Sequence, residues 1–362
     1  ERVIPLNKSV NVCIQKSQKN CVLCVNSGFV VENRGRSKPA MESTFDYSHQ
    51  RAVPVAGGQD GTGEAMMSGS SQELYFGLCT DQNLSFDTLV ERWQYFEGLG
   101  FNSVWDCDHF NQTSNPSGPY FEGWTLLAAL AARTERIRIG VLVSCNTFRH
   151  PGILAHQALT VDHISNGRLE LGIGAGYQEE EHARFGITLP PPGDRRRAFR
   201  EAIQIVDSLL RNETTTFEGR YYRLDGAYLR PGPVQKPRPR LTLAAHKRLM
   251  LRVCAEFADT WNSLGSIEEM RERNAILDEH CAALGRDPLE IRRSWYGWTA
   301  KMIEQGLPDP WQSVDAFEEV VGRYREAGVN EFIIDAPQPQ QFSVLETVAT
   351  DLIPRLRTAN SS

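Results

Sequence analysis

The sequence predicts an α/β protein built as a (β/α)8 TIM barrel, and two observations lead to this fold class. The first is the run of residues 136–176, which reads as strand, helix, strand and glycine-bearing loop. Apolar residues alternate in its two strands, at Ile137, Ile139, Val141 and Val143 and again at Leu169, Leu171 and Ile173. Such alternation marks strands, and a helix between them makes them parallel. The second observation is that about eight such strand–helix pairs follow residue 72, which suits a closed barrel better than an open sheet.

Strand and helix patterns alternate in order from Glu73 to the end of the chain. The expected strands cover residues 74–80, 103–109, 136–143, 169–174, 239–245, 259–265, 291–299 and 331–336. Apolar residues at helical spacing place helices at about 86–99, 124–131, 151–164, 194–211, 250–257, 266–284 and 317–324, with a last helix after the eighth strand. Aromatic alternation around Gly219 and Gly226 predicts a β-hairpin inserted at residues 214–234.

The first 72 residues differ from the rest. They lack sustained periodicity, are rich in Gly, Ser, Asn and Gln, and end in GGQDGTGEAMMSGSSQ. A segment of this composition buries too little apolar surface to order itself, so we expect a disordered N-terminal extension. Met66 and Met67 stand just before the first expected strand, so the extension is interpreted as non-native or upstream sequence, with the barrel domain at residues 73–362.

Charge and hydropathy exclude several classes of protein. The 362 residues carry a net charge of −6 without a dense basic arm, which disfavours nucleic-acid binding. No apolar run approaches the roughly 18 residues of a membrane span. A small-molecule substrate is therefore the better expectation. We also expect a homodimer. Five cysteines fall in expected core elements, which is typical of reduced thiols and predicts a cytoplasmic protein: Cys79, Cys107, Cys145, Cys254 and Cys281.

A metal site is not expected. Cys21 and Cys24 have the spacing of half a zinc site, and Cys13 lies nearby. No second pair follows at ligand spacing, and tetrahedral zinc sites need four ligands.

Polar residues at the carboxyl ends of the strands are the candidates for chemistry, because the loops there build the active site of such a barrel. Asp108 and His109 close the second expected strand. An imidazole titrates near neutrality and can pass a proton, while Asp108 is placed to orient the ring or to bind a ligand. The alternative for His109 is a loop histidine bonded only to backbone.

The third strand is followed by a second group of polar residues. Asn146, Thr147 and His150 precede a helix that opens at Pro151. The free amides of a helix N-terminus favour anions or carbonyl oxygens, so these residues are candidates for ligand binding. Helix capping alone is the equal alternative.

The fourth strand ends in Gly174, Ala175 and Gly176, where a ring or phosphate can approach the backbone. The third glycine of a dinucleotide fingerprint is missing, which disfavours a Rossmann fold. The acidic run at residues 179–181 is interpreted as the solvated first turn of a helix.

The fifth strand ends in Ala244 and Ala245, and His246, Lys247 and Arg248 begin the next helix. Free amides beside three basic side chains suggest a seat for phosphate; an ordinary basic surface turn is the alternative. On the seventh strand, Trp295, Tyr296 and Trp298 face either the core or a substrate cavity, and we expect core packing for at least one.

Five segments together resemble one family. They are SVWDCDHF, RIRIGVLVSCNTFRHP, DHISNGRLELGIGAGYQEEEHARFGI, TTTFEGRYYRLDGAYLRPGPVQKPRPRLTLA and FADTWN. In this order they look like the bacterial luciferase-like superfamily of flavin and deazaflavin oxidoreductases, over nearly all of residues 73–357. The segment VSCNTFRHP is most similar to the coenzyme F420-dependent group.

The resemblance implies a luciferase-like barrel with insertions at strand ends and a cofactor lying across them. It places Asp108 and His109 beside the reacting ring, with His109 handling the proton. It implies a non-proline cis peptide around Leu142 to Ser144. The resemblance also implies that the following residues touch the cofactor: Val143, Ser144, Asn146, Thr147, His150, Gly174, Ala175, Gly176, Tyr177, Ala244, Ala245 and His246.

Two positions depart from the family pattern. Ala244-Ala245-His246 stands where relatives usually have a glycine-rich phosphate turn, and Ala175 stands where the sugar-phosphate dehydrogenase branch has a catalytic glutamate. The resemblance implies hydride transfer with F420 to a small organic substrate. An FMN-dependent monooxygenase that uses O2 and a catalytically silent flavin-binding barrel are the alternatives.

Overall fold

The computed structural model describes residues 2–6, 10–17, 20–25, 73–112 and 115–359, and for residues 2–25 the backbone alone. The chain divides into two units, Glu1–Met66 and Met67–Ser362. In the first unit, strands β1 (Arg2–Leu6), β2 (Val10–Ser17) and β3 (Asn20–Val25) form an antiparallel sheet, with Val3 opposite Cys13 and Cys13 opposite Cys24. These strands lie within the segment that the sequence predicts to be disordered, and apolar residues alternate in β2, at Val10, Val12 and Ile14. The disordered extension stays a prediction. Residues 26–72 lie outside the described part, and the domain boundary stays a prediction.

The second unit is a closed parallel barrel, which confirms the expected fold class. Its strands are β4 (Tyr75–Cys79), β5 (Ser103–Asp106), β6 (Arg138–Val141), β7 (Ser144–Cys145), β8 (Leu169–Gly174), β11 (Arg240–Ala244), β12 (Thr260–Ser263), β13 (Arg292–Gly297) and β14 (Glu331–Asp335). They pair in chain order, and the pairing of β11 with β8 closes the ring, with Leu241 opposite Leu171. β6 and β7 are two parts of the third strand, separated by a cis peptide between Leu142 and Val143, as the resemblance implied.

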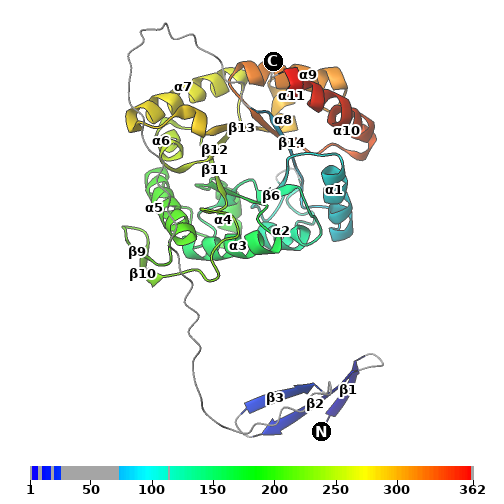
Figure 1. Ribbon diagram of the computed structural model, residues 1–362, viewed down its shortest axis with the longest axis vertical. Helices are drawn as coiled ribbons and strands as arrows, with labels where there is room; N and C mark the ends of the chain where they lie inside the picture. The colour runs from blue at the N-terminus through cyan, green and yellow to red at the C-terminus, as the bar shows by residue number, and fades with distance from the viewer. Residues whose placement is uncertain (1, 7–9, 18–19, 26–72, 113–114, 360–362) are drawn as a thin grey trace, which may run out of the picture. The chain divides into compact units, whose positions relative to one another are not determined.

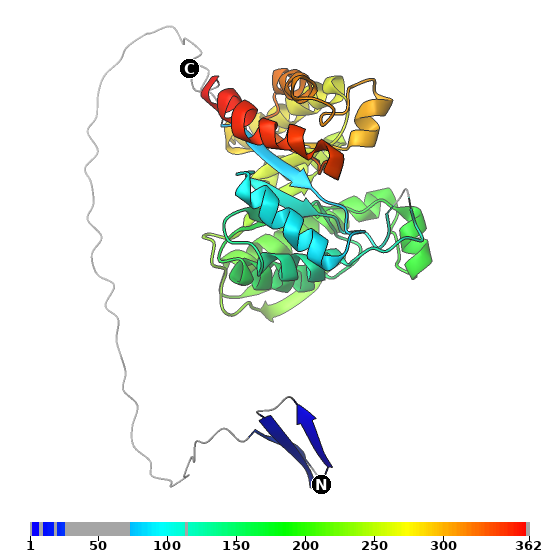
Figure 2. The same cartoon turned by 90° about the vertical axis from the view of Figure 1, so that its right-hand side faces the viewer.

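Helices cover the outside of the ring (Figure 1). They are α1 (Phe86–Gly98), α2 (Gly123–Ala131), α3 (Pro151–Ile164), α4 (Glu179–Phe185), α5 (Pro192–Arg211), α6 (Arg248–Phe257), α7 (Ile267–Leu284), α8 (Thr299–Glu304), α9 (Val314–Glu326), α10 (Phe342–Thr347) and α11 (Ile353–Ala359). A π-helical turn at Val348–Leu352 joins α10 to α11. Figure 2 shows this last helical segment beside α1, and the stacked rings of Tyr95 and Phe342, 5.4 Å apart, join them.

Local sequence signals set the helix ends. Ser85 accepts a hydrogen bond from the Thr88 amide and begins α1. Ser266 and Glu269 form a capping box at the start of α7, and Gly285 ends that helix in the left-handed region with φ 67°. No helix among the described residues is long and apolar enough to span a membrane.

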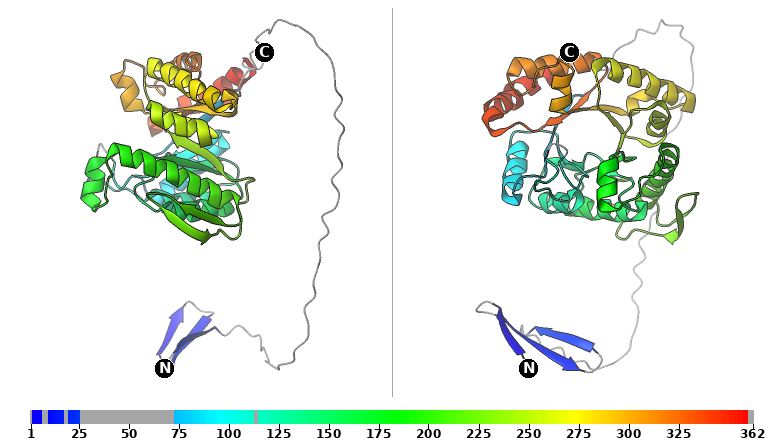
Figure 3. Two further views of the ribbon diagram at one scale, coloured as in Figure 1. Left: turned by 90° about the vertical axis from the view of Figure 1, so that its left-hand side faces the viewer. Right: turned by 180° about the vertical axis from the view of Figure 1, so that it is seen from behind.

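The expected hairpin insertion is present and lies on the outside of the barrel. Strands β9 (Thr215–Glu218) and β10 (Arg223–Ala227) pair antiparallel between α5 and β11 (Figure 3, right). The carboxylate of Glu201 on α5 accepts the backbone amides of Arg220, Tyr221 and Tyr222 at 3.0, 2.9 and 3.2 Å. The turn of the hairpin is therefore fastened to the helix before it.

The core has two parts. The larger part fills the layer between strands and helices and includes Trp93, Trp261 and Trp295, which are almost fully buried. A smaller apolar group lies apart from it and consists of Cys79, Trp105, Leu142 and Ile333, with Cys107, Val143 and Tyr296 packed against them.

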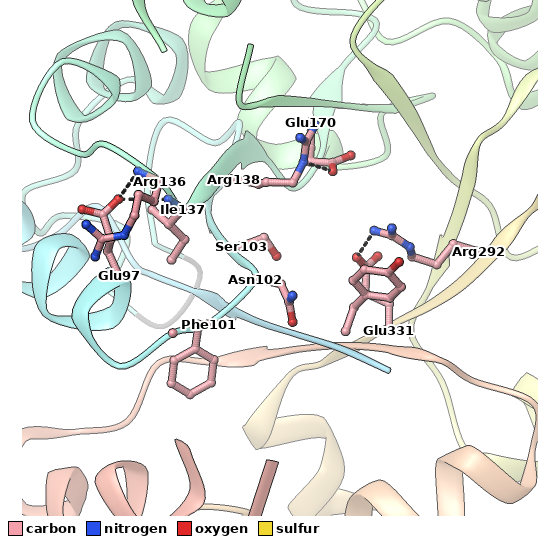
Figure 4. Close-up of a pocket in the computed structure, with 12 residues that line it drawn as sticks. Glu97, Phe101, Asn102, Ser103, Arg136, Ile137, Arg138, Glu170, Arg292 and Glu331 are labelled. Atoms are coloured by element: carbon pink, nitrogen blue, oxygen red, sulfur yellow. Dashed lines mark hydrogen bonds and ion pairs between the residues drawn. The ribbon is translucent and has the colours of Figure 1, made fainter. Parts of the chain in front are cut away.

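The amino-terminal end of the barrel is lined by charged residues that form ion pairs. A cavity of about 300 Å³ there is lined by the first residues of several strands, including Arg138, Arg292 and Glu331 (Figure 4). Arg292 lies 2.8 Å from Glu331, and Arg138 pairs with Glu170. This cavity is at the opposite end from the candidate residues, and charge pairing at this end reads as stability rather than chemistry.

Candidate active site

The carboxyl ends of the parallel strands meet at one end of the barrel and bring most of the predicted residues together. Asp108 and His109 follow β5, residues 146–150 follow β7, Gly176 and Tyr177 follow β8, and Ala245 and His246 follow β11. Strand direction alone produces this gathering, because a parallel barrel presents all its strand-end loops on one face.

His109 is held by a residue that the sequence did not single out. Its Nδ1 donates to Oε2 of Glu181 at 2.9 Å, and the Phe110 amide donates to the other oxygen of Glu181. The expectation of a solvated acidic turn fits Glu179 and Glu180, which are exposed, but is wrong for Glu181, which is buried. Glu181 is the third residue of α4, and that turn carries its side chain inward to the loop after β5.

The pair shifts both proton affinities. Burial by itself lowers the pKa of His109, but the Glu181 hydrogen bond and the surrounding negative charge, which includes Glu181 and Asp108, outweigh it, so the pKa is raised above its usual value. Burial raises the pKa of Glu181, but the bonds from His109 and Phe110 outweigh it and the pKa is lowered. Both shifts favour an imidazolium–carboxylate pair. Since Nδ1 faces Glu181, Nε2 is the ring atom left to exchange a proton with a ligand.

Asp108 does not orient His109 in this structure. Arg149 donates to both of its carboxylate oxygens, at 2.5 and 2.8 Å, and the Cys145 amide donates to Oδ2 at 2.6 Å. Asp108 is 3% exposed, so the pair is buried. The ring-orienting role expected for Asp108 falls to Glu181, whereas Asp108 fixes the end of β5 to β7.

The segment after β7 contributes one buried atom without a partner. Oδ1 of Asn146 is buried and accepts no hydrogen bond in the structure, while Nδ2 donates to the Tyr222 hydroxyl at 3.3 Å. An unpaired buried carbonyl oxygen is costly, so it marks a position for a ligand N–H or O–H. Tyr222 comes from the β9–β10 hairpin and also meets the His150 ring edge-on, at 5.4 Å.

The other polar residues of this segment have partners within the protein. Ser144 accepts from Trp124 Nε1 at 3.0 Å, on the helix side of the strand. Thr147 Oγ1 lies 2.6 Å from Nε2 of His182. His150 accepts from the Gly152 amide at 3.1 Å and is the N-cap of α3. For Ser144 the contact with Trp124 turns the side chain away from the barrel mouth.

Gly174, the last residue of β8, and Gly176 are required by the chain segment beside them, residues 143–147. A Cβ on Gly174 would meet Val143 Cγ2 at 2.7 Å, and a Cβ on Gly176 would meet Thr147 Oγ1 at 2.5 Å. Gly176 also has φ 84°, which L side chains rarely adopt. Tyr177, the next residue, is 63% exposed and meets the His109 ring edge-on at 6.2 Å.

The loop after β11 offers less positive charge to a phosphate than its sequence suggests. The Ala245 amide is bonded to the Asn262 carbonyl at 3.1 Å. Arg248 pairs with Glu279 at 2.5 Å on the surface. Partial desolvation, with the nearby Arg273 charge, lowers the pKa of His246 to about 4, so this histidine is neutral at pH 7 even though its side chain reaches solvent.

A carboxyl group at the end of another strand was missed. Asp335 ends β14, where Tyr296 OH donates to Oδ1 at 2.7 Å and the Thr299 amide donates to Oδ2 at 2.8 Å. Burial, aided by the Asp81 charge, raises the pKa of Asp335 to about 6. The criterion that made Asp108 a candidate, a polar residue at the carboxyl end of a barrel strand, applies equally to Asp335 at the end of the eighth strand. Of the seventh-strand aromatics, Trp295 packs in the core and Tyr296 faces this site.

Comparison with known proteins identifies the family. Residues 62–299 match the luciferase-like monooxygenase family, and the chain belongs to that family. An uncharacterized protein of Mycobacterium tuberculosis is 31% identical over 182 residues, which are 50% of this chain and 61% of that protein. The chain thus matches less than two thirds of that relative's length.

Two further likenesses concern F420-dependent enzymes. The F420-dependent glucose-6-phosphate dehydrogenase of Beutenbergia cavernae is 28% identical over 310 residues, covering 72% of this chain and 90% of that protein. The solved structure of an F420-dependent secondary alcohol dehydrogenase, in complex with an F420-acetone adduct, superposes with a TM-score of 0.68 at 18% identity. The superposition covers 76% of this chain and 98% of the other. At this low identity the likeness shows a shared fold.

Proposed function

We propose that this protein is an oxidoreductase that transfers a hydride between deazaflavin F420 and a small organic substrate. The orphaned carbonyl oxygen of Asn146 is the observation that carries the cofactor assignment. A tricyclic flavin or deazaflavin carries a ring imide N–H, which is the donor that such an oxygen requires. The F420-dependent relative supports the choice of deazaflavin over flavin.

The residues present fit a cofactor of this kind across the mouth of the barrel. Asn146 would accept from the ring, and Gly174 and Gly176 hold the adjacent backbone free of side chains. When bound, the cofactor supplies the hydride, while the protein fixes its position, its substrate and its exposure to water. Lys247 is the basic side chain we assign to the cofactor phosphate, because Glu279 already holds Arg248.

His109 is the proton-handling residue of the proposal. Glu181 fixes the ring through Nδ1 and favours its protonated form, which leaves a proton at Nε2 for the substrate. A group that donates a proton as the hydride arrives stabilises the developing charge on a substrate oxygen. Asp108 is a positioning residue here, since it acts through Arg149 and the Cys145 amide.

The substrate side favours an uncharged molecule with a hydroxyl or carbonyl group. Asp335 and Asp81 contribute negative charge there, and Ala175 replaces the glutamate of the sugar-phosphate branch. Carboxylates near one another repel a phosphate ester. We therefore propose a neutral alcohol or carbonyl compound rather than a sugar phosphate.

Titration of the purified protein with F420 and, separately, with FMN tests the assignment. We expect a submicromolar dissociation constant for F420 and weaker binding of FMN. The Asn146→Leu variant should bind F420 more weakly than the wild type. Tighter binding of FMN, with oxygen uptake once FMN is reduced, would support the monooxygenase instead. Binding of neither cofactor would refute the proposal and favour the silent barrel.

A further inference from the structure

Two thiols lie side by side at the carboxyl end of the barrel. Cys79 is the last residue of β4, and Cys107 follows directly after the neighbouring strand β5. β4 and β5 pair in parallel, with Cys79 opposite Trp105, so Cys107 lies two residues beyond this pairing. The two Sγ atoms are 3.7 Å apart. A disulfide bond is about 2.0 Å long, so the sulfurs need to approach by less than about 2 Å.

The surroundings give the two thiols different roles. Cys79 is 4% exposed, whereas Cys107 is partly open to solvent. The hydrogen bond with Cys107 and burial hold the pKa of the Cys79 thiol well above its usual value, and the charges of Asp335 and Asp81 act in the same direction. Cys79 therefore keeps its proton, and its Sγ lies within hydrogen-bond distance of the Cys107 sulfur. Cys107 is the more accessible of the two sulfurs, so it is the one that an oxidant from solvent reaches first.

We propose that Cys79 and Cys107 form a dithiol site at which hydrogen peroxide makes an intramolecular disulfide. The Cys107 thiolate attacks one peroxide oxygen and the O–O bond breaks, which gives a sulfenic acid on Cys107 and, with one proton, a water molecule. The Cys79 sulfur then attacks the Cys107 sulfur. The S–S bond forms, the S–O bond breaks, and the departing hydroxide takes up the Cys79 proton as water. Peroxide is reduced to two waters, and the two thiols are oxidised.

The disulfide would act on the active site through one short loop. Cys107 precedes His109 by two residues, and the side chain of Gln82 bonds the Cys107 backbone on both sides, at 2.8 Å to its carbonyl and 2.9 Å from its amide. The same Gln82 amide group donates to the Phe121 carbonyl at 2.9 Å. A covalent link between the ends of β4 and β5 pulls on this loop, so oxidation should lower turnover and reduction should restore it.

Peptide mapping of the whole chain after peroxide treatment tests the site. A peptide pair joined through Cys79 and Cys107, absent before treatment and removed by dithiothreitol, is the expected result. In the Cys79→Ala variant, Cys107 should proceed to sulfinic acid, because among the described side chains Cys79 is the thiol that contacts it. In the Cys107→Ala variant, Cys79 should stay reduced. The Cys281→Ala variant is the matched control and should form the same disulfide as the wild type.

A second measurement does not depend on oxidation. A phenylarsine oxide molecule binds two adjacent thiols, so the untreated protein should take up one equivalent at this site, and either single alanine variant should lose it. Circular dichroism would establish that the variants are folded. The proposal fails if peroxide links Cys79 or Cys107 to another cysteine, if it leaves both thiols reduced, or if either single variant binds as much arsenical as the wild type.

Discussion

The Nδ1 atom of His109 and the Oε2 atom of Glu181 lie 2.9 Å apart, although 72 residues separate them in the sequence. The pair joins the loop after β5 to the first turn of α4. It places an imidazole whose pKa is raised beside a carboxylate whose pKa is lowered, at the end of the barrel where the other candidate residues meet.

Replacing Glu181 with Gln should lower the pKa of His109. The carboxylate raises that pKa in the wild type, so its removal takes away support for the imidazolium and the ring loses its proton at a lower pH. A change of about tenfold in proton affinity corresponds to one charge-assisted hydrogen bond. NMR titration of the His109 ring measures it directly, and the exposed Glu180→Gln variant is the control. An unchanged titration would show that Glu181 does not set the charge of the ring.

Replacing His109 with Ala should lower turnover about 100-fold or more while cofactor affinity stays within a few-fold. The reason is that a proton donor acts mainly in the transition state. Steady-state kinetics and a cofactor titration on the same preparation separate the two effects. A loss confined to affinity would make His109 a binding residue instead.

Replacing Asp108 with Asn should destabilise the fold. Arg149 is only 11% exposed, so the substitution leaves a nearly buried guanidinium with Glu122, 3.5 Å away, as its remaining carboxylate, at a cost of about 3 kcal/mol. Urea unfolding measures the difference. The Glu279→Gln variant, which breaks the exposed pair with Arg248, should change stability little. Equal effects of the two substitutions would contradict the structural role assigned to Asp108.

Replacing Asp335 with Asn should flatten the dependence of stability on pH. The folded pKa of Asp335 is raised to about 6, so the folded state holds a proton that the unfolded chain, with a pKa near 3.9, has released. Stability therefore falls as pH rises through about 6, by roughly 1 kcal/mol between pH 5 and 7.5. Urea unfolding at these two pH values should show that fall shrink in Asp335→Asn and persist in the exposed Asp225→Asn control.

A chain that begins at Met67 should keep the melting temperature of the whole protein within about 5 °C. The boundary between the two units falls at this residue, and the barrel core comes from residues 74 onward. Differential scanning calorimetry compares the two chains. A larger fall would mean that the first unit stabilises the barrel.

Periodicity predicted the barrel well, because its elements alternate between a period of two and a helical period. Strand ends were less predictable. The second strand was expected to reach His109 but ends at Asp106, since the following residues turn to place Cys107 and His109 around the barrel mouth. The third strand divides into β6 and β7, and alternation continues across the division.

Side-chain partners were the part that the sequence could not supply. Three consecutive glutamates at residues 179–181 are equivalent by composition, and only the rotation of α4 selects Glu181 for His109. Arg149 and Asp108 are separated by 41 residues and meet because β5 and β7 end on the same face. The Asn146–Tyr222 contact depends on an insertion whose path over the barrel no local pattern fixes.

That insertion links a remote carboxylate to the proposed cofactor seat. Glu201 accepts hydrogen bonds from three backbone amides of the hairpin turn. This turn contains Tyr222, whose hydroxyl accepts from the Asn146 side chain. The Asn146 side chain is therefore held mainly in one rotamer before a ligand binds. Binding then loses less side-chain entropy, because folding has already ordered this residue. If the proposed cofactor binds at Asn146, Glu201 would contribute to its affinity by pre-organisation, through the hairpin and not through a contact of its own.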